Sequence, residues 1–346
     1  MKNKMKTHIF MPDQLDQAAQ CLKEGGLVAF PTETVFGLGA IANNEAAVQS
    51  VFKTKGRPND NPLIIHVASI ESVHHYAASV SPLAQALMEK FWPGPLTIIL
   101  PIKTGTFAPA ATAGQNTAGF RMPDQDQTLA LIDKVGFPLV GPSANLSGKP
   151  SPTSLAHVLH DFNGKIAGVV ANQAELTAIG VESTVVLPLA DHIEILRPGH
   201  VTVNMIEEAI GVPAHVRTAA EQLANQAIMS PGVKYRHYSP KQPVYLMAFD
   251  HTLEDWQEEI DKFPEAVAIL AYQDHITSLQ NHQKVVASYS LGKKGDWESA
   301  TRHLFAGLRA LEESSAKILM VQGLDPKVAD HQAYMNRLSK AATHVL

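Results

Sequence analysis

Residues 217–242 interrupt the pattern of the chain and divide it into two parts. The segment lacks a clear apolar period and contains turn residues such as Pro231 and Gly232. Long segments without regular structure are usually functional or disordered, and the aromatic and basic run at 234–238 favours a functional one. A length of 346 residues favours about two domains. We therefore predict domains at 1–216 and 243–346, joined by a linker.

The part before the linker predicts a mixed α/β domain with many strands. Leu15, Ala18 and Leu22 form the apolar stripe of a first helix, which Gly25 ends. Apolar periods and turn residues then predict strands at 27–30, 62–67, 96–100, 117–122, 138–141, 167–171, 181–187 and 193–197, and helices at 13–24, 44–55, 81–91, 127–134, 153–161 and 204–210. This pattern leaves the order of the strands open.

In the part after the linker, predicted strands alternate with predicted helices. Strands are predicted at 243–249, 266–272, 285–290 and 317–322, with helices at 252–262, 296–314 and 327–342. Such alternation is typical of a small open parallel sheet, Rossmann-like in layout. The region has no G-x-G-x-x-G sequence, so we assign it no dinucleotide.

Charge and cysteine content exclude several classes of protein. The formal net charge of −5 disfavours a general nucleic-acid coat, which needs a broad basic surface, but leaves room for a local basic pocket. The single cysteine, Cys21, rules out an internal disulfide and a cysteine-rich zinc site. No apolar run is long enough for a signal peptide or a membrane span. We expect a cytoplasmic protein that is not attached to a membrane.

Three cations lie within five residues at the end of a predicted helix: Lys53, Lys55 and Arg57. They could simply complement the helix dipole. Gly56 and Pro58, however, fix the chain around Arg57, and cations held on a stiff loop suit a triphosphate. The sequence therefore predicts a phosphate site here.

Two further candidates lie in or beside predicted strands. Thr32, Glu33 and Thr34 follow the strand at 27–30 and face whatever lies beyond the sheet edge, although a turn with capping hydroxyls explains them as well. Arg121 stands between apolar neighbours, so we expect it to be half-buried and to need an anion. A substrate carboxylate suits it, because a guanidinium grips a carboxylate at two points.

Residues 141–153 have the composition of a phosphate cradle. They follow an apolar strand and precede a helix, and they bring together hydroxyls, an amide, a lysine and backbone N–H groups. The spacing is too long for a Walker A loop, and a proline follows Lys149. A capping loop for the helix at 153 is the alternative.

The chain shows no pattern for covalent or metal-centred chemistry. It has no G-x-S-x-G elbow, no H-E-x-x-H and no convincing metal cluster. The chemistry therefore looks like positioning and charge stabilisation, as in phosphoryl and nucleotidyl transfer. Magnesium would come with ATP, held mostly by phosphates and water, and we expect no structural metal.

These motifs together resemble the YrdC-like family of threonylcarbamoyl-AMP synthases, in its long two-domain form. The resemblance covers nearly the whole chain and rests on segments 31–38, 55–63, 92–97, 121–123, 142–153, 180–184 and 230–238. The C-terminal region matches by placement and layout more than by motif. The resemblance implies a twisted, largely open α/β sheet with a concave basic cavity, over which the linker folds as a lid.

The resemblance also implies roles for individual residues. L-threonine would be held by Thr32, His66, Arg121 and Ser183 with the backbone near Gly141, and Arg121 would take its carboxylate. ATP would be held by Lys55, Arg57, Asn61, Thr117, Ser143, Asn145, Ser151, Arg197 and the Tyr238 region of the lid. Lys55 and Arg57 would be the catalytic residues, neutralising charge on the phosphates.

The reaction implied by the resemblance joins L-threonine, bicarbonate and the AMP part of ATP. The threonine amine attacks a bicarbonate-derived carbon, and the resulting N-carboxylate attacks the α-phosphorus as pyrophosphate leaves. The product would feed a downstream transferase machinery that makes N6-threonylcarbamoyladenosine in tRNA. No residue stands out as a general base. A lid that excludes water would protect the labile intermediates.

Three other functions stay open at this point. The cavity could bind double-stranded RNA, although the net charge speaks against it, and direct tRNA binding is undecided. The chain could be an amino-acid and ATP sensor without turnover. A carbamoyltransferase sharing the fold is a third alternative, but such chains resemble this one only as part of larger proteins with zinc-finger-like cysteines.

Overall fold

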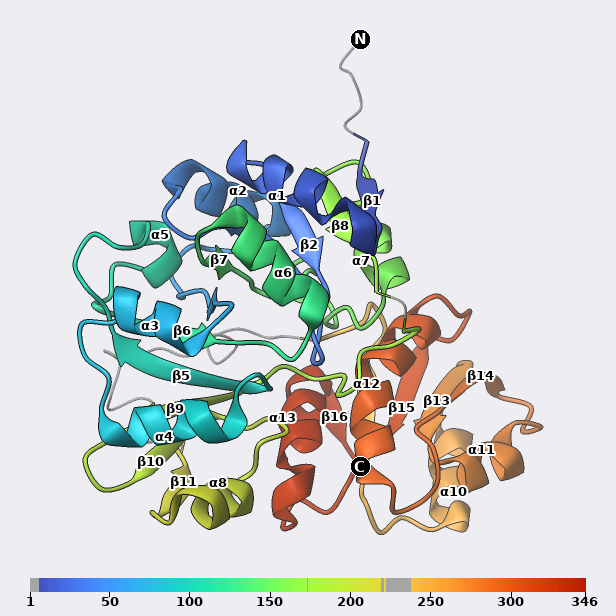
Figure 1. Ribbon diagram of the computed structural model, residues 1–346. Coiled ribbons are helices and arrows are strands. Elements are labelled where there is room, and N and C mark those ends of the chain that lie inside the picture. Colours follow the sequence, from blue (N-terminus) through green and yellow to red (C-terminus); the bar gives the residue numbers. More distant parts are fainter. Residues whose placement is uncertain (1–5, 173, 219–220, 222–237) are drawn as a thin grey trace.

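The computed structural model describes residues 6–172, 174–218, 221 and 238–346 and contains two sheets (Figure 1). The first has eleven strands in the order β1-β8-β2-β3-β7-β4-β6-β5-β9-β10-β11. They are β1 (His8–Phe10), β2 (Val28–Phe30), β3 (Gly37–Ile41), β4 (Ile65–His66), β5 (Leu96–Pro101), β6 (Thr117–Arg121), β7 (Leu139–Val140), β8 (Gly168–Val170), β9 (Thr184–Pro188), β10 (Ile193–Arg197) and β11 (Ala214–Val216). Neighbouring strands run both parallel and antiparallel, which confirms the predicted mixed α/β domain.

Helices cover this sheet and bury their apolar faces against it. They are α1 (Leu15–Lys23), α2 (Glu45–Lys55), α3 (Ile70–Tyr76), α4 (Pro82–Phe91), α5 (Pro109–Thr112), α6 (Asp126–Val135), α7 (Leu155–Phe162) and α8 (Val203–Ile210). Helix α1 packs beside α6, and α4 beside α8. No helix among the described residues is both long and apolar enough to cross a membrane.

Helix α2 shows how local sequence places a cation at the site. The Asn44 side chain accepts a hydrogen bond from Ala47 N and so begins the helix. Val51 and Phe52 are buried and fix its orientation on the sheet. The helix ends at Lys55, and Arg57 enters the following loop with its guanidinium over the Phe52 ring, 5.8 Å from the ring centre.

The second sheet is smaller and entirely parallel, as its alternating pattern predicts. Its order is β14-β13-β15-β12-β16. The strands are β12 (Val244–Met247), β13 (Val267–Ala271), β14 (Val285–Ser290), β15 (Ile318–Gln322) and β16 (His344–Val345), and the helices are α10 (Leu253–Lys262), α11 (Gln273–Leu279), α12 (Trp297–Glu312) and α13 (Gln332–Ala341). This confirms a Rossmann-like C-terminal domain.

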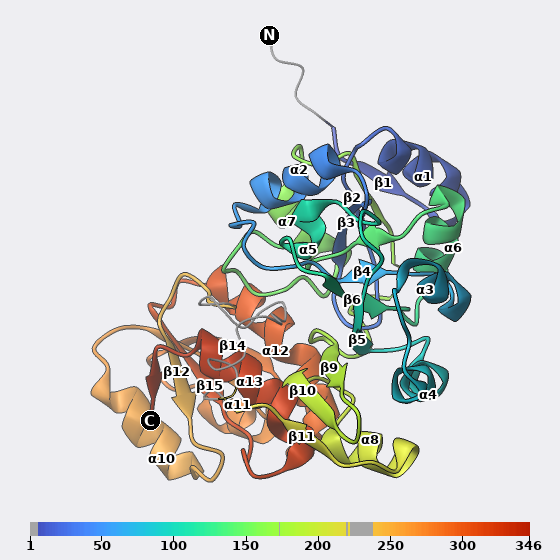
Figure 2. The ribbon, with the colours of Figure 1, turned by 90° about the vertical axis from the view of Figure 1, so that its left-hand side faces the viewer.

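Helices α12 and α13 lie on the side of the second domain that faces the first (Figure 2). Arg302 Nε on α12 donates to Thr177 O at 3.2 Å. Gly180 lies against the same turn of α12 with a φ of +85°, and a Cβ there would sit 2.5 Å from Arg302 Cα. Two domains can approach this closely at residue 180 because glycine has no side chain.

Several predicted boundaries were wrong. Strand β3 was missed because Gly37 and Gly39 hide the strand pattern; a Cβ on Gly37 would lie 2.7 Å from the Phe30 ring. The short helices α3, α5 and α11 and the short strands β1, β11 and β16 were missed as well. The strand predicted at 181–187 begins only at Thr184, because the preceding residues line a cavity instead. The helix predicted at 327–342 begins at Gln332, after a 3-10 turn.

We expect Gly180→Ala to lower the free energy of unfolding by about 3 kcal/mol, combining a strained backbone with overlap against α12. Gly295→Ala is the matched control, since Gly295 has a similar φ of +87° but open space where a Cβ would go. The control should lose only about 1 kcal/mol in urea denaturation, from backbone strain alone. Equal losses in the two variants would contradict the proposed contact.

Candidate active site

A cavity opens where the strand ends and loops of the first sheet meet the second domain. Its empty volume is about 670 Å³, a figure that includes open solvent at its mouth. The lining residues are Thr32, Val35, Phe36, Gly37, Arg57, Leu63, Ile64, His66, Arg121, Gly141, Pro142, Ser143, Asn145, Glu182, Ser183, Arg197 and Tyr238. Ten of the residues predicted for the site are among them, from segments that are distant in sequence.

Arg121 reaches the cavity from the end of β6 and is 4% exposed. Its Nη2 lies 2.7 Å from Glu33 Oε1, and its Nε donates to Gly94 O at 3.3 Å. Nη2 is buried and has this ion pair but no hydrogen bond of suitable geometry within the described residues. The ion pair with Glu33 offsets the cost of burying the charge, and the remaining N–H groups can take a second anion.

His66 lies beside Arg121 in a neutral state. Burial and the charge of Arg121 lower its pKa to about 3. Its ring meets the Phe30 ring edge to face, with centres 5.3 Å apart. Gly141 makes this packing possible, because a Cβ there would lie 2.6 Å from His66 Nδ1. A neutral imidazole beside a cationic arginine can bond a ligand without adding charge.

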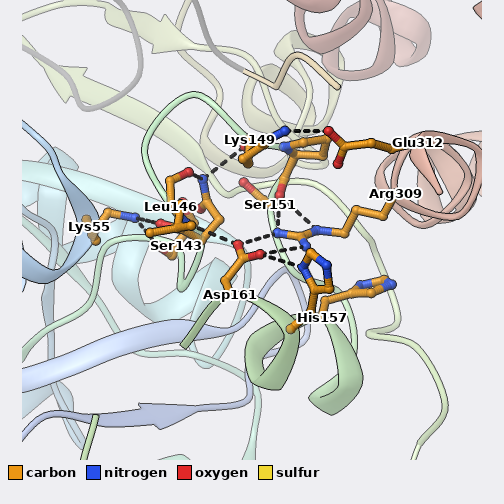
Figure 3. A network of polar contacts seen from close by, with 12 residues as sticks. Lys55, Ser143, Leu146, Lys149, Ser151, His157, Asp161, Arg309 and Glu312 are labelled. Carbon is orange, nitrogen blue, oxygen red and sulfur yellow. Dashed lines mark hydrogen bonds and ion pairs between the residues drawn. The ribbon is translucent and has the colours of Figure 1, made fainter. Parts of the chain in front are cut away.

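The loop at 141–153 is tied from behind by a buried lysine (Figure 3). Lys55 Nζ donates to Ser143 O and to Asn145 O, the latter at 2.7 Å. Asn145 Nδ2 bonds the carbonyls of Leu146 and Lys149, each at 2.9 Å, while its Oδ1 is buried without a hydrogen-bond partner. The loop is therefore held rigid with Asn145 Oδ1 left for a donor from a ligand.

Helix α12 holds the other side of this loop (Figure 3). Arg309 Nη2 lies 2.8 Å from Asp161 Oδ2 and 2.7 Å from Pro150 O. Asp161 Oδ2 in turn accepts from Leu146 N at 3.1 Å. Lys149 pairs with Glu312 on the same helix. The loop thus spans the two domains, between Lys55 on one side and α12 on the other.

Lys55 itself lies behind the cavity wall rather than on it. It is 3% exposed, and burial together with Arg57 lowers its pKa to about 7. Its contacts with two carbonyls make it a clamp for the loop in this structure. Its direct contact with phosphate, implied by the resemblance, stays a prediction.

Ser183 and Arg197 form the opposite wall. Arg197 Nε and Nη2 donate to Ser183 O at 3.1 and 2.9 Å, and Ser183 Oγ lies 2.8 Å from Thr97 Oγ1. Burial lowers the pKa of Arg197 to about 10, so it stays charged at neutral pH. These bonds orient a cation and a hydroxyl toward the same space.

Tyr238 contributes an aromatic side chain from the end of the linker. It is 5% exposed, and its ring packs against Phe305 of α12 with ring centres 5.0 Å apart. Its φ of +68° is uncommon for a residue with a side chain, and such strain is found most often at functional sites. Burial raises its pKa to about 12. The lid was predicted for the linker at 217–242, of which 219–220 and 222–237 lie outside the described residues.

Four predicted residues either use polar groups in contacts within the protein or lie outside the cavity, and their roles toward a ligand stay predictions. The Thr32 hydroxyl is used within its own turn, donating to Val35 O at 2.7 Å. Asn61 O accepts from Arg57 Nη2 at 3.3 Å, and Ser151 Oγ donates to Glu182 Oε1 at 2.5 Å, so both lie one contact away from the cavity. Thr117 lies in a separate small hollow beside Ile99.

Glu33 was named from the sequence as a candidate without a role, and Glu182 was given no role. Glu33 pairs with Arg121, and Glu182 lines the cavity and pairs with an arginine of the second domain. Each stands inside a motif already singled out, in a stretch of otherwise uncharged residues. A single carboxylate among uncharged residues was the sequence feature that could have indicated a role in the site.

The fold and the cavity define a two-domain α/β protein with a pocket lined by three arginines. A family model described as "Telomere recombination" matches residues 20–199, and one described as "Threonylcarbamoyl-AMP synthase, C-terminal domain" matches residues 201–343. The chain belongs to the threonylcarbamoyl-AMP synthase family. This confirms the resemblance drawn from the motifs.

Two curated relatives and one solved structure are similar to this chain over almost its whole length. The threonylcarbamoyl-AMP synthase of Bacillus subtilis is 42% identical over 95% of this chain and 93% of its own length. That of Pyrococcus abyssi is 39% identical over 94% of this chain and 93% of its own length. The crystal structure of P. abyssi Sua5 complexed with L-threonine superimposes with a TM-score of 0.87 at 36% identity, covering 98% of this chain and 99% of that one.

We expect the imidazole of His66 to stay neutral in the folded protein from pH 8 down to about pH 4, because its pKa is about 3. Unfolded histidine titrates near 6.5, so folding stability is full above that value and falls as the pH drops toward 3. NMR of the ring carbons and nitrogens measures this directly. A His66 titration near pH 6.5 would contradict the buried neutral state.

We expect Lys55→Met to lower the free energy of unfolding by about 2 kcal/mol, since two charge-assisted bonds to carbonyls are lost. Amide hydrogen exchange should also speed up at Ala144, Asn145 and Ser147 in the loop. The control is Lys53→Met, which changes an exposed lysine on the same helix. If both variants exchange at the wild-type rate, Lys55 is not the clamp.

Proposed function

We propose that this chain is a nucleotidyltransferase that makes threonylcarbamoyl-AMP and pyrophosphate from L-threonine, bicarbonate and ATP. The observation that carries the proposal is one cavity walled by Arg57, Arg121 and Arg197 beside a neutral histidine. Three cations suit the combined negative charge of an amino-acid carboxylate, bicarbonate and a triphosphate. Family membership supports the same reading.

The threonine half of the cavity is proposed at Arg121. Its Nη1 and Nη2 would grip the substrate carboxylate, with Gly94 O and Glu33 holding the guanidinium from behind. The relative from P. abyssi was solved with L-threonine. Neutral His66 and Ser183 Oγ would bond polar groups of the same substrate, while Thr32 shapes the turn that forms the wall.

The ATP half is proposed at Arg57, Arg197 and the loop at 141–153. The two guanidiniums would take phosphate oxygens, and Ser143 and Asn145 would bond the nucleotide from the loop. ATP enters as its magnesium complex. Glu182 and Glu33 are both paired with arginines, so the magnesium ion would be held by phosphates and water.

The reaction then proceeds by positioning and charge stabilisation. The threonine amine attacks the carbon of bicarbonate, water leaves, and an N-carboxylate forms. That carboxylate attacks the α-phosphorus of ATP, and pyrophosphate leaves as the acyl-phosphate bond forms. Arg57 and Arg197 would stabilise charge on the phosphates during this step. The labile product would pass to a downstream transferase for N6-threonylcarbamoyladenosine in tRNA, and a cytosolic location stays a prediction.

The direct test is pyrophosphate release from ATP, with and without L-threonine and bicarbonate. We expect release only when both are present. Arg121→Met should raise the KM for threonine about 100-fold, because a charged hydrogen-bond pair to the carboxylate is lost, and should change the KM for ATP much less. Arg217→Met is the control, since Arg217 pairs with Glu194 away from the cavity.

Other outcomes would select among the alternatives. Pyrophosphate release that does not depend on threonine would contradict the synthase proposal. ATP and threonine binding without release would favour a sensor. Binding of double-stranded RNA with a steep dependence on salt would favour an RNA-binding protein.

A further inference from the structure

Arg337 is a fully buried residue of α13 that reaches from the second domain to the cavity wall. Its Nε lies 2.9 Å from Glu182 Oε2, and its Nη2 donates to Glu182 O at 3.0 Å. Its Nη1 donates to Pro198 O, in the turn directly after Arg197. One guanidinium therefore holds both segments that carry Glu182 and Arg197 into the cavity, although it does not line the cavity itself.

Glu182 is a negatively charged residue in a cavity that we propose binds anions. It lines the space proposed for ATP, and an unpaired carboxylate there would repel a triphosphate. Together with Arg337 and Arg197 it forms a buried group of one anion and two cations. The group has a net charge of +1, and removing Arg337 would leave the two remaining residues with a net charge of zero.

We infer that Arg337 is a positioning residue for nucleotide binding, through which the C-terminal domain neutralises Glu182 and keeps Arg197 in place. The inference rests on the proposed function for the identity of the anion, ATP. It gives the second domain a defined role, because the cation that balances the cavity comes from α13.

A purely structural role for Arg337 makes a different prediction. Removing one partner of any buried ion pair destabilises a protein. An electrostatic role predicts that removing the second charge restores nucleotide affinity. The double variant Arg337→Met with Glu182→Gln leaves Arg197 as the charge of the group, and so returns it to +1.

The experiment compares ATP affinity in the full-length chain for wild type, Arg337→Met, Arg337→Lys and the double variant. We expect Arg337→Met to raise the KM for ATP about tenfold or more, and the double variant to recover most of that loss. Arg337→Lys keeps the positive charge but loses the two-point hydrogen bonding of the guanidinium, so its KM for ATP should lie between those of the wild type and Arg337→Met. Arg217→Met, which breaks a buried ion pair outside the cavity, should lower thermal stability without changing the KM for ATP.

A pH profile gives a second readout. In the native chain burial raises the pKa of Glu182, but Arg337, Arg197 and the Ser151 hydroxyl outweigh it and hold that pKa at about 2. Tyr238, Lys340 and Lys55 also face this carboxylate. Without Arg337, Glu182 should take up a proton at higher pH. The affinity defect of Arg337→Met should therefore shrink as the pH falls from 7.5 to 5.5, relative to the double variant.

The outcomes separate this inference from the proposed function. Equilibrium binding of ATP, measured by calorimetry, needs no turnover, so it tests Arg337 even if no threonine-dependent release is found. A double variant no better than Arg337→Met, or a pH-independent defect, overturns the inference while leaving the synthase proposal intact. Absence of ATP binding by the wild-type chain overturns both. If Arg337→Met fails to fold, the Arg337→Lys and double variants decide the question.

Discussion

Compensation of buried charge is the constraint on which the rest of this structure depends. A cavity that binds anions needs cations away from bulk water, and each buried cation is costly unless acceptors surround it. Arg121 has Glu33 and Gly94 O, and Arg197 has Ser183 O. Lys55 has the two loop carbonyls. Each of these cations has an acceptor within the protein, and Arg121 and Arg197 also line the cavity.

The same constraint explains why the two domains are packed so closely. Arg309 and Arg337 leave α12 and α13 and end inside the first domain, each on a carboxylate and on a backbone carbonyl. Without them, the buried carboxylates Asp161 and Glu182 would lose their arginine partners. The interface between the two domains therefore contains buried ion pairs as well as apolar contacts. The two-point hydrogen bonds of the guanidinium groups fix how the domains are oriented, in addition to the surface area that they bury.

The sequence located much of this site because chemistry was concentrated in short motifs. Ser143 and Asn145 follow an apolar strand, and Arg57 follows a helix end, so local patterns placed them correctly at the cavity. Thr117 shows the limit of that reasoning. It shares β6 with Arg121 but is four residues away, which is about 13 Å along a strand, and it lies in another hollow. The strand order depends on pairings such as β2 with β8, between residues far apart in the chain, which local periodicity does not encode.

Glu182 and Arg337 are 155 residues apart in sequence, and this separation has a consequence during synthesis. At roughly 5–20 residues per second, the ribosome makes Arg337 about 8 to 30 seconds after Glu182. Throughout that interval the nascent catalytic domain holds a carboxylate without its main counter-ion. Until α13 has been synthesised, Glu182 must stay in contact with water or its surroundings must stay unpacked. The pocket reaches its final charge only when α13 packs against the first domain.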